Sequence, residues 1–400
     1  MERAVQENRP EPRPNGPLRS CYQILNTAVS IETDSAELLR LFDRDYAWFR
    51  VPRRHAGTGG ARLDCRLRLE GNTRAPYLDI NGEKASLEGH PNPASCACHL
   101  LLSRLFESCG EFVLLHAAVV AREQGAVILA GPPGAGKTTL ALSLLEKGLS
   151  FFSDDVCPVH RKTRLVHPFP RSAWVRLKDG EAGPAVRTDA VCRPAERLHP
   201  FPRSGKALSA ADRLSGRVGS RPLEATHLFY LAPGEEDRTV CTLEIGLKEG
   251  SEEPFFRGLA AIESDIQAEP LGQGTASGWR IRYPSGRGLS GRLREFLCEH
   301  REAIWNVFRD DEVRPDFSQA PHLTRLSVHE AAFRLLGDLK QCTDNPARHA
   351  AGVPGRPGRL LLEMAGLLRE TACYRLSPGR LEARRDLVLE LLRSSPSLGG

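Results

Sequence analysis

The sequence predicts an α/β fold built on a mixed sheet, with a small α+β domain before that core and a helical segment after it. Three observations support this prediction. An apolar stretch, a glycine-rich loop and an apolar helix follow one another between residues 126 and 148. Alternating strand patterns and one amphipathic helix occupy residues 19–96, and helical patterns dominate residues 321–400. A chain of 400 residues is also long enough for two or three structural units.

Changes in composition along the chain divide it into five segments. The first segment, residues 1–18, lacks apolar periodicity and carries prolines, so we expect a disordered tail. The fourth segment, residues 241–320, has mixed patterns, including a helix predicted near 289–307. The segments are the tail at 1–18, the small α+β domain at 19–96, the α/β core at 97–240 with a basic, proline- and glycine-rich loop insertion at about 180–222, an accessory segment at 241–320 and the helical C-terminal segment at 321–400.

The composition points to a cytoplasmic protein without a membrane partner. No stretch approaches the ~18 apolar residues that a membrane span requires, and the N-terminus has charges and prolines where a signal peptide is apolar. The 11 cysteines are scattered and odd in number, which is typical of reduced thiols. The net charge of +5 does not by itself imply nucleic acid.

The glycine-rich loop matches the G-x-x-x-x-G-K-[ST] pattern through Gly131, Gly136, Lys137 and Thr138. Such a loop curls so that successive backbone N–H groups point at phosphate oxygens at the start of a helix. Lys137 would reach the β- and γ-phosphates of a nucleotide, and the Thr138 hydroxyl would ligate Mg²⁺. We therefore expect ATP and Mg²⁺ as cofactors, bound by Gly131, Pro132, Pro133, Gly134, Ala135, Gly136, Lys137, Thr138 and Thr139.

Two carboxylates follow the next apolar strand, at Asp154 and Asp155. If the strand before them runs to the carboxyl edge of the sheet, they lie where ligands of α/β proteins bind. One can then bind Mg²⁺, directly or through water, and the other can accept the proton of an attacking hydroxyl. His116 lies in an apolar strand pair at 111–121. A lone histidine there is more often a core or capping residue, so the residues alone do not assign it.

The arginines of the predicted insertion could be a solvated surface, a phosphate clamp or a nucleic-acid footprint. They are not interleaved with aromatic side chains, as a platform for single-stranded nucleic acid requires. We therefore expect a solvated surface or an acidic partner rather than nucleic acid.

The chain resembles the HPr kinase/phosphorylase family and its smaller relatives, which share the C-terminal domain of HPr serine kinase. The resemblance covers residues 111–178 most specifically, and rests on His116-Ala-Ala, the loop from Gly131 to Thr138, the helix from Leu140 to Gly148, Phe152-Ser-Asp-Asp-Val156 and Val166-His-Pro-Phe-Pro-Arg171. It implies a core related to phosphoenolpyruvate carboxykinase and an ATP-dependent kinase acting on a hydroxyl, expected to be serine, of a protein or peptide. In that family Asp155 matches the general base, Asp154 lies near the metal, and His116 matches a catalytic-site histidine.

The sequence also departs from this family. The loop continues with Thr139 where the family has glutamate, and the downstream stretch associated with HPr recognition and with the reverse, phosphorolytic reaction is not recognisable. HPr is therefore not the expected acceptor, whereas serine on a ribosomally made peptide stays open, because some relatives act on it. The alternatives are a nucleotide-gated binding module without phosphoryl transfer and a small-molecule kinase. Members of the family form oligomers, but no stretch here specifies one.

Overall fold

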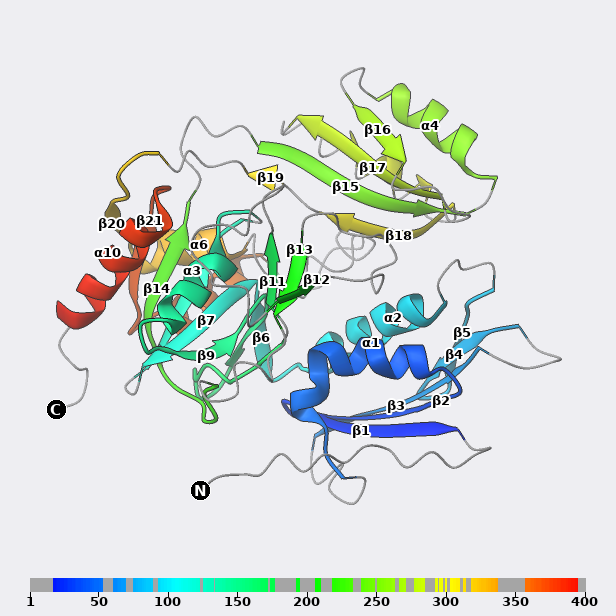
Figure 1. The fold of residues 1–400 in the computed structure, drawn as a ribbon, viewed down its shortest axis with the longest axis horizontal. Helices are drawn as coiled ribbons and strands as arrows, with labels where there is room; N and C mark the ends of the chain where they lie inside the picture. The colour runs from blue at the N-terminus through cyan, green and yellow to red at the C-terminus, as the bar shows by residue number, and fades with distance from the viewer. Residues whose placement is uncertain are drawn as a thin grey trace. The chain divides into compact units, whose positions relative to one another are not determined.

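The computed structural model describes most of the chain outside its tail and several loops. The described residues are 17–52, 60–69, 75–88, 93–122, 125–132, 134–171, 173–176, 192–194, 206–209, 218–232, 239–248, 250–262, 266–270, 277–284, 292–293, 295–297, 299–300, 303–309, 312–313, 318–336 and 357–394. The tail expected at 1–18 therefore lies almost entirely outside them, and its last residue already begins the first strand. The fold is a mixed α/β fold with several sheets (Figure 1).

The chain divides into two compact units, residues 1–109 and 110–400. The first unit is a five-stranded sheet in the order β1-β2-β3-β4-β5, in which only the β2–β3 pair is parallel. Its elements are β1 (Leu18–Ile24), β2 (Thr27–Thr33), α1 (Ala36–Tyr46), the 3₁₀ turn η1 (Ala47–Phe49), β3 (Ala61–Arg68), β4 (Tyr77–Ile80), β5 (Glu83–Ser86) and α2 (Pro93–Ser108). The helix α2, which the sequence assigns to the α/β core, packs on α1 and β3 and belongs to this unit.

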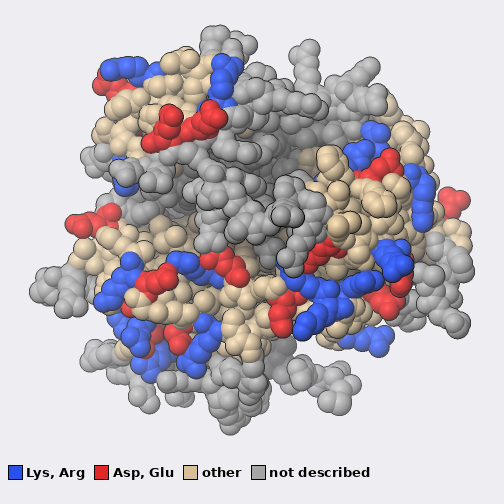
Figure 2. Space-filling model, turned by 180° about the vertical axis from the view of Figure 1, so that it is seen from behind, with Lys and Arg blue, Asp and Glu red and all other residues tan. Residues whose placement is uncertain are grey.

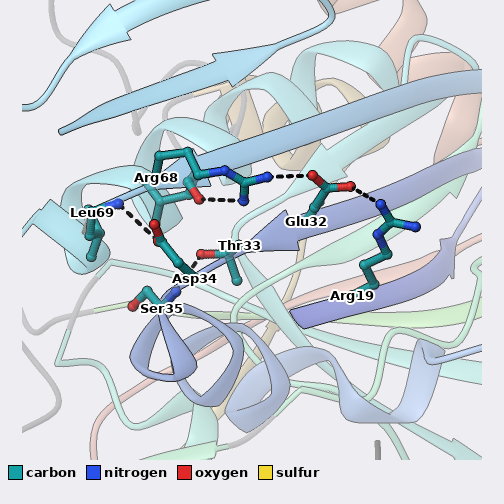
Figure 3. Close-up of polar contacts among 8 residues, drawn as sticks. Arg19, Glu32, Thr33, Asp34, Ser35, Arg68 and Leu69 are labelled. Atoms are coloured by element: carbon teal, nitrogen blue, oxygen red, sulfur yellow. Dashed lines mark hydrogen bonds and ion pairs between the residues drawn. The ribbon is translucent and has the colours of Figure 1, made fainter. Parts of the chain in front are cut away.

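Polar contacts fix the point where β2 ends and α1 begins (Figure 3). The Ser35 hydroxyl accepts a hydrogen bond from the Leu38 N–H at 3.2 Å, which caps the first turn of α1. Nearby, Glu32 lies between two arginines, 2.8 Å from Arg19 and 2.5 Å from Arg68. Burial alone would raise the pKa of Glu32, but the hydrogen bond from Arg68 and the two positive charges lower it below its ordinary value. The sequence-predicted α+β domain is thus a sheet with a capped helix and a charged cross-strand ladder.

The second unit is organised around a six-stranded sheet in the order β20-β21-β14-β8-β7-β9. β8 and β21 both pair with β14 in parallel, while β7 is antiparallel to β8 and to β9. Four strands, β9, β8, β14 and β21, therefore run in one direction. The strands are β7 (Ala117–Arg122), β8 (Gly125–Ala130), β9 (Ser150–Ser153), β14 (Ala225–Leu231), β20 (Leu323–Arg325) and β21 (Ala372–Leu376).

Alternate residues of these strands fill two apolar layers, because successive side chains point to opposite faces of a sheet. Val127 and Leu129 of β8 face α3 (Lys137–Leu145) and α10 (Leu381–Ser394), which contact each other (Figure 1). Ile128 faces the opposite layer. That layer contains α6 (Val328–Leu336), α9 (Pro357–Leu367) and a strand pair of β6 (Phe112–Leu115) and β10 (Cys157–His160).

The C-terminal segment at 321–400, expected to be helical, also contains strands. Its β20 and β21 complete the edge of the central sheet, and α10 covers the same face as α3. β21 belongs to the central sheet because its residues 372–376 pair in parallel with residues 227–231 of β14. The C-terminal segment is therefore part of the α/β core.

The accessory segment forms its own sheet, in the order β16-β17-β15-β18 with β19 also on β15. Its apolar core includes Phe255 of α4 and Ile245 of β15. The helix predicted near 289–307 is wrong at its C-terminal end: the last described helical residue is 299, residue 303 lies in a turn, and residues 304–309 pair with β15. The elements are β15 (Thr239–Leu247), α4 (Glu252–Ala260), β16 (Gln267–Pro270), β17 (Ser277–Pro284), β18 (Ile304–Arg309) and β19 (Glu312–Val313).

The basic insertion expected at 180–222 lies mostly outside the described residues. Its described parts include two strands, β12 (Cys192–Pro194) and β13 (Lys206–Ser209), and β13 pairs with both β12 and β11 (Ala173–Arg176). No helix among the described residues has the length and apolar character needed to cross a membrane.

Candidate functional site

The candidate site lies at one edge of the central sheet. β8 and β9 run in the same direction, so the loop after β8 and the acid pair after β9 emerge together. β7 runs the opposite way and begins at this edge, which brings in His116, the residue immediately before it. β21 also ends here, and α10 begins five residues later. The topology thus gathers four segments that are distant in sequence.

The glycine-rich loop turns sharply between β8 and α3. Gly131, Gly134 and Gly136 all have positive φ, at 141°, 84° and 89°, a backbone conformation that side chains disfavour. Gly136 caps α3 in the left-handed conformation and has no side chain to satisfy the first N–H groups of the helix. Those N–H groups have no acceptor within the helix, and such a helix start favours an anion.

We expect replacement of Gly131 by alanine to destabilise the protein by at least about 2 kcal/mol. A Cβ atom at this position would lie 2.4 Å from the Leu231 carbonyl oxygen, and the φ of 141° is strained for alanine. The matched control is Gly148→Ala, which has φ of 92° but nothing within 4 Å of the added atom. Thermal unfolding of both variants measures the two losses of stability. Equal decreases in melting temperature would contradict the expected close approach of the loop to β14.

Lys137 begins α3 and folds its side chain back over the loop. Its ammonium donates hydrogen bonds to the carbonyl oxygens of Gly131 at 2.6 Å and Pro132 at 3.2 Å, and the residue is only 8% exposed. The Pro132 carbonyl also accepts from the Ala135 N–H at 3.2 Å. The lysine therefore fixes the curl of the loop and holds a positive charge close to the start of α3.

Asp154 is joined to the helix by a hydrogen bond from the Thr138 hydroxyl, 2.8 Å from its Oδ1. The carboxyl is buried, at 4% exposure. Burial and the neighbouring charge of Asp155 raise its pKa to about 6, against the opposing effects of the Thr138 hydrogen bond, Lys137 and Arg171. A divalent cation beside the two carboxylates would relieve this cost.

The raised pKa makes a prediction for the stability of the ligand-free protein. Because the folded-state pKa lies above the ordinary 3.8, protonated Asp154 stabilises the fold fully at low pH, and this contribution is lost as the pH rises through about 6. Asp154→Asn has no proton to lose, so its stability should fall less than that of the wild type between pH 5 and pH 7.5, by about 1 kcal/mol.

Thermal unfolding at the two pH values measures this difference. Asp64, whose side chain is about half exposed and pairs with Arg62 in the first unit, supplies the control Asp64→Asn, which should keep the wild-type pH dependence. An unchanged pH dependence in Asp154→Asn would show that the Asp154 carboxyl does not titrate in this range.

Asp155 occupies an unusual turn directly after Asp154. Its φ is 70°, and the Val156 N–H donates to the Asp154 carbonyl at 2.9 Å, which is the pattern of a γ-turn with positive φ. This conformation costs of order 1–3 kcal/mol. It leaves the Asp155 carboxylate 39% exposed, with His116 Nδ1 3.5 Å from one oxygen and Arg171 Nη1 3.5 Å from the other.

The edge brings together nearly all the residues that the sequence singles out. His116, Lys137, Thr138, Asp154 and Asp155 meet there, and Thr139 lies in the first turn of α3. Pro133 lies outside the described residues. Two residues of the site were not predicted. Arg171 ends the Val166-to-Arg171 stretch, which contributes to the family resemblance but predicts no role for the arginine. Arg384 of α10 is 247 residues beyond Lys137, and no sequence pattern indicated it.

The donor set is compatible with Mg²⁺ held jointly with a substrate. Thr138 and Asp154 supply hard oxygen donors, and Asp155 adds a second carboxylate beside them. Within the described residues, no cluster of three or more His, Cys, Asp or Glu side chains could hold a metal alone. Mg²⁺ commonly binds through one or two carboxylates together with substrate phosphates, so these residues fit that cation.

Comparison of the chain with protein-family models and with curated proteins found no match.

Proposed function

We propose that the protein is an ATP-dependent phosphotransferase, similar to HPr serine kinase, that transfers the γ-phosphoryl group of ATP to a serine hydroxyl of a protein or peptide. The observation that carries the proposal is the position of the Asp155 carboxylate. It is partly exposed at the sheet edge on which the glycine-rich loop, Lys137 and the Thr138–Asp154 pair converge. Phosphoryl transfer uses a site that binds the phosphates and, beside it, a residue that orients or deprotonates the attacking hydroxyl.

Each residue of the site has a distinct proposed role. The N–H groups of the loop and Lys137 bind the β- and γ-phosphates, and α3 adds the positive end of its dipole. Thr138 and Asp154 would hold Mg²⁺, and the bound cation would neutralise charge on the phosphates. Arg171 and His116 hold the Asp155 carboxylate from both sides. The proposed core is the phosphate-loop fold that this family shares with phosphoenolpyruvate carboxykinase.

Asp155 then acts as general base. As the acceptor oxygen forms a bond to the γ-phosphorus, its proton passes to the Asp155 carboxylate, and the bond from the γ-phosphorus to the bridging oxygen breaks to leave ADP. The partial exposure of the carboxylate gives an acceptor hydroxyl access to it. Asp154 is suited to the metal instead, because its buried Oδ1 already accepts the Thr138 hydroxyl.

The surface is compatible with a protein or peptide acceptor. On the face shown in Figure 2, Lys and Arg side chains of the described residues lie among Asp and Glu side chains. A nucleic-acid footprint is ordinarily a continuous basic patch or stripe. We propose a cytoplasmic location, where unpaired thiols such as the buried Cys157 stay reduced.

The test is a transfer assay with the full chain, MgCl₂ and ATP labelled on the γ-phosphate. Acceptors are a serine-, threonine- and tyrosine-containing peptide pool, a set of small alcohols and single-stranded RNA. We expect label on peptide, stable to acid and released by alkali, as phosphoserine is. Label on the small alcohols alone would favour a small-molecule kinase. ATP binding without transfer to any acceptor would disprove the kinase proposal and favour a nucleotide-gated binding module.

A further inference from the structure

Arg384 lies in the first turns of α10, on the helix face that packs toward α3. Val388 and Leu392, one and two turns further along, are buried in the apolar layer between the two helices. Arg384 is itself only 3% exposed. It thus occupies a position on the buried stripe of the helix where an apolar residue would be ordinary.

Few polar contacts of the described residues offset the cost of burying the Arg384 guanidinium. Its one polar contact among the described residues is a hydrogen bond from Nη1 to the Ala135 carbonyl oxygen, at 3.2 Å. Nε is buried without a hydrogen-bond partner, and no described carboxylate forms an ion pair with the side chain. Burial lowers the pKa of Arg384 only to about 10, so the group stays charged at neutral pH. A buried charge without a counter-ion is costly to the fold, which means that stability alone does not explain this arginine.

The contact falls on the peptide that closes the glycine-rich loop. In a planar trans peptide the C=O and N–H groups point in opposite directions. A guanidinium that holds the Ala135 carbonyl on the α10 side therefore turns the Gly136 N–H to the other side. Nη1 also lies 3.3 Å from the place where a Cβ of Gly136 would be, so the arginine packs directly against the residue that caps α3.

We propose that Arg384 is a positioning residue for the triphosphate of the bound nucleotide. It fixes the Ala135–Gly136 peptide so that the Gly136 N–H faces the phosphates, and its charge adds to the positive field of the loop. The C-terminal helix is thereby part of the phosphate site. This inference rests on the nucleotide site of the proposed function, but it does not require that transfer occurs.

The test compares Arg384→Met and Arg384→Lys with Arg393→Gln, an exposed arginine in the last turn of the same helix. MgATP affinity is measured by calorimetry and stability by thermal unfolding. We expect Arg384→Met to bind MgATP about tenfold more weakly, the effect of losing about 1.4 kcal/mol. Its melting temperature should stay equal or rise, because the variant removes a buried charge. Arg384→Lys, which keeps a donor and a charge, should recover part of the affinity, and Arg393→Gln should match the wild type.

Where transfer is measurable, Arg384→Met should raise the KM for ATP about tenfold and leave kcat within about threefold, because the loop binds the phosphates in ground and transition states alike. Wild-type affinity in Arg384→Met would overturn the inference and leave the proposed kinase intact. The inference would also be overturned if both Arg384 variants had a lower melting temperature and their loss of MgATP affinity were explained by that loss of stability. Failure of the wild type to bind MgATP would overturn the inference together with the nucleotide site. Weaker binding by Arg384→Met in a protein that transfers no phosphate would support it while removing the kinase function.

Discussion

Asp155→Asn is expected to lower the rate of the proposed phosphoryl transfer by about 10²–10⁴-fold, the usual contribution of a general base. The substitution preserves the shape of the side chain and removes its ability to accept a proton. His116 and Arg171 each lie 3.5 Å from this carboxylate, so the turn and its neighbours should keep their places. MgATP affinity should therefore stay within about threefold of the wild type.

Transfer of labelled phosphate to the best acceptor, with calorimetry of MgATP in parallel, separates these two effects. Asp64→Asn is the matched control, since its carboxylate pairs with Arg62 on the surface of the first unit. Equal transfer by wild type and Asp155→Asn would remove Asp155 as the base. A parallel loss of affinity and rate would instead assign Asp155 to binding.

The sequence contained most of the site because its parts adjoin apolar strands. Gly131 follows β8 directly and Asp154 follows β9 directly, so predicting the strands also predicted what emerges from their ends. His116 could not be placed from its own context. The short hairpin-like connection at 122–125 indicates the antiparallel β7–β8 pair. The contact of His116 with Asp155 depends also on the pairing of β7 with β9, which no local pattern specifies.

Arg384 shows where local patterns fail. The apolar stripe of α10 is visible in the sequence, but the loop carbonyl that Arg384 contacts is 249 positions away in the chain. The strand β21 was similarly missed within a segment that was predicted to be helical, because a parallel strand is defined by its partner, here β14. The same holds for residues 304–309, where pairing with β15 overrides the predicted helix.

Lys137→Met should weaken MgATP binding by about 100-fold. Its ammonium is held by the Gly131 and Pro132 carbonyls beside the first N–H groups of α3, which places the charge where the β- and γ-phosphates are proposed to bind. A hydrogen bond to a charged group contributes about 1.5–3 kcal/mol, and a loss near 3 kcal/mol corresponds to about 100-fold in affinity. Methionine fills a similar volume, and calorimetry against MgATP measures the change.

Lys147→Met is the matched control, because this lysine is exposed just beyond the same helix and should bind MgATP as the wild type does. Lys137→Arg should not restore binding, since the planar guanidinium cannot replace a compact ammonium between two loop carbonyls. The melting temperature separates a lost ligand contact from a collapsed loop. If Lys137→Met bound MgATP with wild-type affinity, the loop would not be the phosphate site, and both the kinase proposal and the role of Arg384 would fall with it.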